Sequence, residues 1–244
     1  MERDEFLAAT IDNAAAIARA VQTAPSASVP SCPDWRLRDL GFHVACVLHF
    51  WGDVIQRAGR QPQPLGSGMT PPEDPGLERL VRGECDACVD LLRGVEDDHP
   101  AWTWWGEPNA RSVPRRLAHE TTIHRWDATN ALGDPDPIGS PLAADGIAEF
   151  YGVLMPDSRV PPEGLIGRVA LDATDVTRRW LVTIEAGSQP NIATASSTTG
   201  TQGTLRGTAE QLLLVLWRRL PLETAELSGD RDLVHQLIEY PILR

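Results

Sequence analysis

The sequence predicts two regions of different fold class, a four-helix bundle followed by a small α+β domain. In the first half, apolar residues recur every three or four positions over long stretches, as they do on amphipathic helices. In the last third, short stretches alternate apolar and polar residues, which is typical of half-buried strands. A run of helices followed by strands mixed with helices favours separate domains. We place the boundary at residue 158, which gives domains 1–158 and 159–244.

The bundle is predicted from four helical stretches separated by proline- and glycine-rich connections, at residues 3–22, 35–57, 76–95 and 113–132. Asp34 can cap the second helix. Pro114 is acceptable in the first turn of the fourth helix, and Gly133 ends it. We assign a further apolar helix, at 145–155, to the end of the first domain.

The second domain is predicted to begin with strands and to end with a helix. The strands are expected at 166–175, at 178–187, within the small, polar stretch 193–207, and within 222–230. A strong amphipathic helix is expected at 207–220, with Thr208 as its cap, and a closing helix at 230–240.

Composition excludes several classes of function. The 244 residues carry a net charge of −12 and contain no lysine, so arginine supplies all 22 basic side chains. Mechanisms that need a lysine, such as Schiff-base formation, are therefore excluded. A nucleic-acid partner is not expected, because neutralising phosphates needs a concentrated basic face and no basic run offsets the acidic excess.

The four cysteines, Cys32, Cys46, Cys85 and Cys88, all lie in the first 90 residues. Cys85 and Cys88 form a CxxC, but no second CxxC completes a zinc knuckle and no βαβ pattern precedes the pair. We therefore favour thiols on a helix over a redox centre. The amino terminus has no apolar signal segment, and no stretch is long enough to span a bilayer. These features predict a cytoplasmic protein with no membrane partner.

The segment RRLAHETTIHRWDA, residues 115–128, contains a metal-ligand pattern. Glu120 and His124 are four residues apart, so on a helix they share one face. His119 is five residues from His124, about 140° out of register, so it points elsewhere. The pattern also differs from the HExxH of zinc proteases, because here the glutamate itself would be a ligand.

A catalytic zinc needs a third protein ligand and one open position. His43 lies among apolar residues of the second predicted helix, where it can meet a Glu/His pair on another helix of the bundle. By itself such a histidine is more often a core residue held by a hydrogen bond. Combined with Glu120 and His124 it becomes the third expected ligand, because unpaired polar groups inside a bundle are costly.

Three blocks of the chain, VPSCPDWRLRDLGFHV, WTWWGEPNARSVPRRLAHETTIHRWDA and GTAEQLLLVLWRRLPLETAELSGD, together resemble a known family. They are similar, in this order, to the signature blocks of the mycothiol-dependent maleylpyruvate isomerases. The resemblance implies an N-terminal DinB-like four-helix bundle and a C-terminal domain of the sterol-carrier type. It also implies a divalent metal, with zinc expected, held by His43, Glu120 and His124, and mycothiol or a similar thiol as cofactor.

A thiol bound to such a metal loses its proton, which makes it a strong nucleophile. Its partner would be a small electrophilic substrate. If the adduct rotates and expels the thiol, the result is isomerisation; if the adduct persists, the result is S-transfer. The alternatives are a non-catalytic metal- and ligand-binding module and a regulatory DinB relative. The sequence leaves the substrate and the oligomeric state open.

Five further residues receive expected roles. Arg116 can bind substrate carboxylates, and Asp127 can orient the His124 side of the site. Arg219 matches an arginine of the family's third block, and it is assigned to catalysis together with Arg116 and Asp127. Arg125 and Trp105 are assigned to binding the thiol. A salt-bridged helix surface and plain core packing are the competing interpretations of Arg125 and Trp105.

Overall fold

The computed structural model describes residues 1–155 and 160–241. The chain separates into two compact units, residues 1–137 and 138–244. The predicted boundary at residue 158 lies outside the described residues, and the division follows Pro137 instead. The helix that we had assigned to the end of the first domain therefore belongs to the second, where it packs against a helix of that unit.

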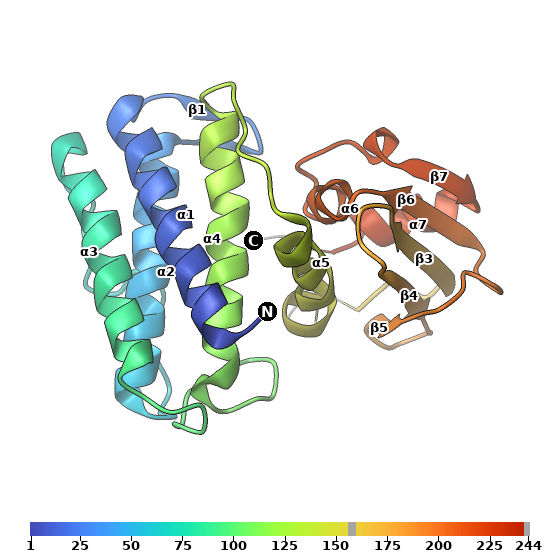
Figure 1. Cartoon of the computed structure of the whole chain (residues 1–244), viewed down its shortest axis with the longest axis horizontal. Coiled ribbons are helices and arrows are strands. Elements are labelled where there is room, and N and C mark those ends of the chain that lie inside the picture. Colours follow the sequence, from blue (N-terminus) through green and yellow to red (C-terminus); the bar gives the residue numbers. More distant parts are fainter. Residues whose placement is uncertain (156–159, 242–244) are drawn as a thin grey trace. The chain divides into compact units, whose positions relative to one another are not determined.

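The first unit is the predicted four-helix bundle (Figure 1). Its helices run side by side and are α1 (Arg3–Thr23), α2 (Leu37–Arg57), α3 (Asp74–Arg93) and α4 (Val113–Asn130). The core between them consists of fully buried aliphatic side chains such as Ile17, Leu40, Leu48, Val81 and Leu117. A short 3-10 turn, Ala110–Ser112, leads directly into α4.

A small hairpin, absent from the sequence prediction, precedes α2. It pairs β1 (Ser28–Val29) with β2 (Cys32–Arg36). The chain stays extended through Arg36, so α2 begins at Leu37, and the prediction that Asp34 caps this helix was wrong. The carboxylate of Asp39 instead accepts a hydrogen bond of 2.8 Å from the Arg36 backbone N–H, as in a capping box.

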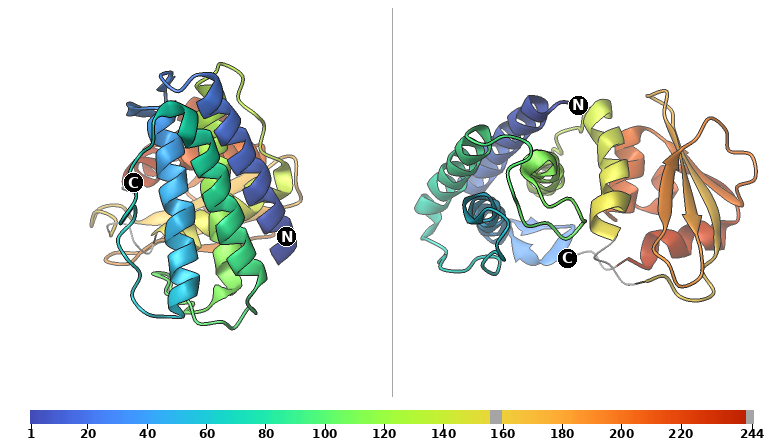
Figure 2. Two further views of the ribbon diagram at one scale, coloured as in Figure 1. Left: turned by 90° about the vertical axis from the view of Figure 1, so that its left-hand side faces the viewer. Right: turned by 90° about the horizontal axis from the view of Figure 1, so that it is seen from below.

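The second unit contains a mixed five-stranded sheet in the order β5-β4-β3-β6-β7. The strands are β3 (Gly167–Ala173), β4 (Arg179–Ile184), β5 (Asn191–Thr194), β6 (Gly203–Gly207) and β7 (Glu226–Gly229). β3 and β6 are parallel neighbours, and the other strand pairs described are antiparallel. The polar stretch 193–207 thus supplies parts of two strands where the sequence predicted one. Side chains of β4 alternate between buried and half-buried, because helices cover one face of the sheet (Figure 2).

The helices of the second unit are α5 (Ser140–Glu149), α6 (Ala209–Leu216) and α7 (Arg231–Glu239). A π-helical turn, Phe150–Leu154, continues α5, and a 3-10 turn, Leu222–Thr224, follows α6. The predicted cap of α6 is confirmed, since the Thr208 hydroxyl accepts a hydrogen bond of 3.1 Å from the Gln211 backbone N–H. In the described parts of the chain, no helix combines the length and the apolar character needed to cross a bilayer.

Candidate metal centre

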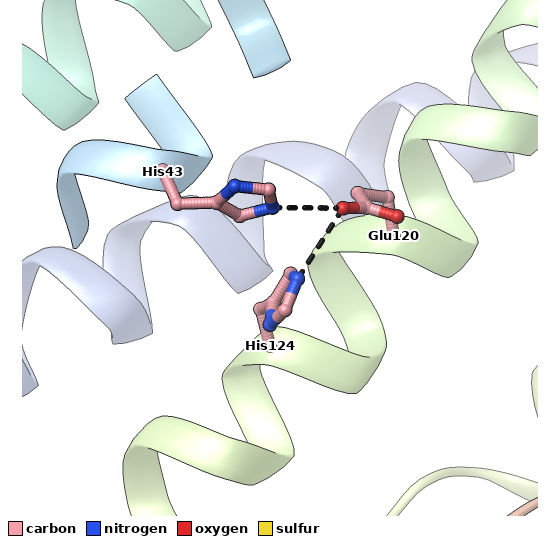
Figure 3. Close-up of side chains that lie close together, drawn as sticks. All are labelled: His43, Glu120 and His124. Atoms are coloured by element: carbon pink, nitrogen blue, oxygen red, sulfur yellow. Dashed lines mark hydrogen bonds and ion pairs between the residues drawn. The ribbon is translucent and has the colours of Figure 1, made fainter. Parts of the chain in front are cut away.

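Helix α4 places Glu120 and His124 on one face, one turn apart. The His124 Nε2 atom lies 3.3 Å from Oε1 of Glu120. Both residues are turned toward α2, as Figure 3 shows. The shared face predicted from their spacing is therefore present in the folded chain.

Helix α2 brings His43 to the same carboxylate oxygen. Its Nε2 atom is 3.3 Å from Oε1 of Glu120, so one oxygen stands between two imidazole nitrogens (Figure 3). The ligand atoms of the three residues all lie within 4.8 Å of one another. Side-chain exposure falls from 23% at His43 to 14% at Glu120 and 10% at His124, so His43 marks the more accessible side.

The three ligand atoms suit a small divalent ion. Zinc binds imidazole nitrogen and carboxylate oxygen at about 2.0–2.2 Å in tetrahedral sites, which separates neighbouring ligand atoms by roughly 3.3 Å. The two nitrogen-to-oxygen distances of 3.3 Å match this separation. Three protein ligands leave at least one tetrahedral position for another molecule. His43, Glu120 and His124 could therefore hold a divalent metal ion, with all three ligand atoms within 4.8 Å of one another.

Arg116 sits one turn before Glu120, and its guanidinium donates to Oε2 of that carboxylate. Burial by itself would raise the pKa of Glu120, but the charge of Arg116 and hydrogen bonds from the two histidines hold it well below its usual range. Glu120 is consequently ionised, with Oε1 directed to the histidines. We expected Arg116 to bind substrate carboxylates; its guanidinium, 5% exposed, contacts Glu120, and the expected role stays a prediction.

Asp127 occupies the outer side of His124. Its Oδ2 atom lies 3.1 Å from His124 Nδ1. A carboxylate only accepts, so Nδ1–H donates to Asp127, and in the metal-free protein Nε2–H faces the Glu120 carboxylate. Burial would lower the pKa of His124, but the hydrogen bonds to Asp127 and Glu120 outweigh it and raise this pKa to about 9 in the metal-free protein. Asp127 therefore lies where an orienting role requires it.

The β1–β2 hairpin adds two residues that the sequence analysis did not assign to the site. The Trp35 ring centre is 4.9 Å from that of His43 and 6.2 Å from that of His124. The Ser31 hydroxyl donates to Oδ1 of Asp127 at 2.5 Å. Helical spacing could not reveal either residue, because both lie outside helices. The only sequence signal was their membership in the VPSCPDW block.

The residues assigned to thiol binding have other described contacts. Arg125 donates to the Pro137 carbonyl at 2.9 Å and pairs with Asp136, both in the segment after α4. The Trp105 indole donates to the Ser112 hydroxyl at 3.0 Å. The same ring packs against Trp51 in an aromatic cluster of the bundle. These contacts hold both side chains in place, and thiol binding by them stays a prediction.

Arg219 belongs to the second unit. Its guanidinium lies 5.5 Å from the ring centre of Trp217 and donates to the Trp217 carbonyl at 3.0 Å. It lines a cavity of about 460 Å³ together with Arg218, Glu223 and His235. Arg218, which precedes it, has φ +55° in the left-handed region that glycine favours, so the backbone turns sharply where Arg219 leaves the helix.

His119 and the CxxC pair lie apart from the candidate ligands. His119 is buried, with its ring centre 5.9 Å from that of Phe6 on α1. Cys85 and Cys88 are buried free thiols on α3, as expected from the sequence. Burial raises the pKa of Cys85 to about 12 and also raises that of Cys88, which disfavours the thiolate form of both.

The first unit is thus a four-helix bundle with a His–Glu–His cluster between two of its helices, and the second unit is an α+β domain. Residues 6–129 match the family model described as the mycothiol maleylpyruvate isomerase N-terminal domain, and residues 141–236 match the corresponding C-terminal domain. The chain belongs to the mycothiol-dependent maleylpyruvate isomerase family.

Solved structures agree with this assignment at the level of the fold. Crystal structures of the mycothiol-dependent maleylpyruvate isomerase and of its histidine-to-alanine mutant each superpose with a TM-score of 0.66. Each is 15% identical to this chain, and the match covers 94% of this chain and 95% of the other. No match was found among curated protein sequences. The predicted fold class, a helical bundle followed by an α+β domain, is confirmed.

Proposed function

We propose that this protein is an enzyme that holds one divalent metal ion, zinc by preference, and uses it to activate mycothiol or a similar thiol against a small electrophile. The observation that carries the proposal is the convergence of His43, Glu120 and His124 within 4.8 Å. The name of the structural relatives supports the thiol, since they are described as mycothiol-dependent isomerases. We retain the expectation that the protein works in the cytoplasm.

The chemistry divides between the ion and the chain. A divalent ion at this site would stabilise the deprotonated, nucleophilic form of a thiol at neutral pH. Arg116 keeps Glu120 ionised and engages its second oxygen. Asp127 fixes the His124 ring with Nε2 inward. These contacts pre-organise the ligand set before any substrate arrives.

Trp35 supplies an apolar surface beside this ligand set. Its half-buried ring lies against His43, the most exposed of the three ligands. A molecule that approaches the ion from this accessible side meets the indole. We infer that Trp35 packs against the non-reacting part of the thiol or of the electrophile.

Isomerisation and S-transfer are two outcomes of one addition step. The thiol adds to an electrophilic carbon, and a double bond of the substrate becomes a single bond that can rotate. Expulsion of the thiol restores both the double bond and the free cofactor, whereas retention gives a stable thioether. Isomerisation is our first choice, because it is the activity in the relatives' name. Product analysis by mass separates the two, since only S-transfer adds the mass of the thiol.

Three further residues enter the proposal from the sequence, Arg219 through the family resemblance and the other two through their places beside and before the ligand pair. Arg219 is proposed to be a catalytic residue, and Arg125 and Trp105 are proposed to bind the thiol. Arg219→Lys, which keeps the charge but loses the planar fork, should lower turnover if bidentate binding of a carboxylate is its role. Arg125→Gln and Trp105→Phe should raise the KM for the thiol. Unchanged kinetics in these variants would remove the corresponding residues from the site.

Metal stoichiometry is the first test. We expect about one zinc per chain in protein produced with zinc, and loss of that zinc in His43→Ala. His49→Ala is a matched control, because His49 is on the same helix and also contacts a glutamate, Glu84, at 3.0 Å. Protein without stoichiometric metal, or equal loss in both variants, would overturn the proposal.

The second candidate function is a metal- and ligand-binding module without turnover, for which the cavity beside Arg219 offers a ligand site. Incubation of the zinc-loaded protein with mycothiol and a panel of maleyl compounds and epoxides separates the two. Isomerised or thiol-adduct products that disappear in His124→Ala support the enzyme. A zinc-loaded protein that is inert toward every pair supports the module.

A further inference from the structure

We propose that Ser31 is a positioning residue of the metal centre, which acts on His124 through Asp127. The proposal rests on the proposed function in one respect, the presence of a metal ion at His43, Glu120 and His124. It extends the site from the two helices to the β1–β2 hairpin, and it gives the hairpin a task in metal binding.

A continuous line of hydrogen bonds joins the hairpin to the ligand. The Ser31 hydroxyl donates to Oδ1 of Asp127 at 2.5 Å, and His124 Nδ1–H donates to Oδ2 at 3.1 Å. The two partners thus hold the two oxygens of one carboxylate. This fixes the plane of the carboxylate, and with it the direction from which Asp127 accepts the hydrogen bond of His124.

Burial makes the Ser31 contact important to Asp127. The carboxylate is 0% exposed, so bulk water does not compensate the loss of a donor. A buried carboxylate requires hydrogen bonds from the protein, and those to a charged group contribute more than neutral ones. Without the hydroxyl, Asp127 has fewer constraints on its orientation, and the His124 ring that depends on it becomes less well placed.

Contacts at the turn and at the base hold the hairpin in place. Pro30 and Ser31 form the two-residue turn between the paired Val29 and Cys32, and the proline ring restricts φ in that turn. Val29 is fully buried in the bundle core. The Leu37 backbone N–H donates to the Ala27 carbonyl at 2.9 Å, which ties the base of the hairpin to the start of α2. Ser31 is therefore held in place from both sides.

The expected loss of zinc affinity follows from the position of Ser31 behind Asp127. Loss of a group that directly orients a metal ligand costs about 10- to 100-fold in metal affinity. Ser31 acts one step further away, so we expect Ser31→Ala to weaken zinc binding by roughly 3- to 10-fold. Ser31→Thr keeps a hydroxyl on the same carbon and should restore most of the affinity.

The test is competition for zinc between the protein and a chromophoric chelator of known affinity, with the full-length chain. The variants are Ser31→Ala, Ser31→Thr, Asp127→Asn and the double variant Ser31→Ala/Asp127→Asn. Ser28→Ala is the matched control, because Ser28 is exposed on the first strand of the same hairpin. Circular dichroism and thermal unfolding of each metal-free variant establish that it is folded.

Coupling between the two positions decides the mechanism. If Ser31 acts through Asp127, Ser31→Ala weakens zinc binding in the unmodified protein and adds nothing in the Asp127→Asn background. Equal zinc affinity of Ser31→Ala and Ser28→Ala would overturn the proposal and leave the proposed function standing. An equal loss in both backgrounds would also overturn it, because Ser31 would then act independently of Asp127. Failure of the unmodified protein to bind zinc would overturn the proposed function and this inference together.

Discussion

Helix α2 presents two histidines, His43 and His49, each to a glutamate of another helix. The two contacts differ in their exposure and in the groups around them. His43 meets Glu120 of α4 at 3.3 Å, and His49 meets Glu84 of α3 at 3.0 Å. The His49 side chain is 45% exposed, whereas that of His43 is 23% exposed. In the described residues, a second histidine, His124, completes a possible set of metal ligands at the first pair and not at the second.

The candidate metal centre differs from a surface ion pair in the groups that support it. An exposed pair is solvated and screened, so it contributes little and has no need of further partners. The pair at Glu120 is backed by Arg116 and Asp127, which orient the carboxylate and the second imidazole. A second histidine and a set of orienting groups, rather than the contact between histidine and glutamate, distinguish the candidate metal centre.

Removal of a ligand should have the largest effect. His124→Ala takes away one of three donors, and we expect nearly all bound zinc to be lost during purification. His49→Ala should keep its full complement of zinc. Elemental analysis of both proteins, prepared side by side, measures this. Retention of zinc by His124→Ala would mean that the ion binds elsewhere.

Removal of the cation beside Glu120 should destabilise the metal-free protein. Arg116→Met leaves a nearly buried carboxylate without its charge partner, so the free energy of unfolding should fall by about 3 kcal/mol. Arg57→Met is the control, since Arg57 forms a more exposed i,i+4 pair with Asp53 and its loss should cost below about 0.5 kcal/mol.

Urea denaturation of both variants measures the two changes. Added zinc should recover part of the stability of Arg116→Met, because the ion offers the carboxylate a new positive partner. Similar losses in Arg116→Met and Arg57→Met would show that the carboxylate at the centre is no different from one on the surface.

Zinc affinity should rise with pH up to about pH 9. The pKa of His124 is raised to about 9 in the metal-free protein, so below that pH zinc has to displace a proton. The apparent affinity should therefore increase by about tenfold per pH unit from pH 7 toward pH 9. Chelator competition across this range measures the slope. A flat profile would contradict the raised pKa.

The stability of the metal-free protein should change in the opposite direction. Because the folded pKa of His124 exceeds its unfolded value, its stabilising contribution is complete below about pH 6.5 and is lost as pH rises through about 9. His124→Gln should remove this pH dependence. Unfolding curves of both proteins without zinc, recorded between pH 6 and pH 9, provide the measurement.

The smallest effect is expected at the accessible side of the centre. Trp35→Ala removes the ring beside His43, and we expect the KM for the thiol or the electrophile to rise by about fivefold with kcat little changed. Trp102→Ala is the control, since Trp102 belongs to the aromatic cluster around Phe50. Equal effects of the two substitutions would indicate loss of packing rather than loss of a substrate contact.

Within single elements, the sequence was a reliable guide. The spacing of Glu120 and His124 places both on one face of any helix, because 3.6 residues per turn is a local property of the backbone. The same periodicity located the four helices of the bundle, with ends that differ by a few residues from the predicted ones. The hairpin at Ser28–Arg36 was missed because its strands are too short for alternation to show.

Local patterns in the sequence were enough to predict the order of fold classes and the Glu/His pair, and His43 was identified through its place on a helix and the family resemblance. Only the folded chain shows that Arg116 donates to Glu120, that the Ser31 hydroxyl donates to Asp127, and that Trp35 lies against His43. It also shows that the units divide after Pro137. The physical reason is that helical period depends on neighbours in the chain, whereas these contacts depend on how separate elements pack.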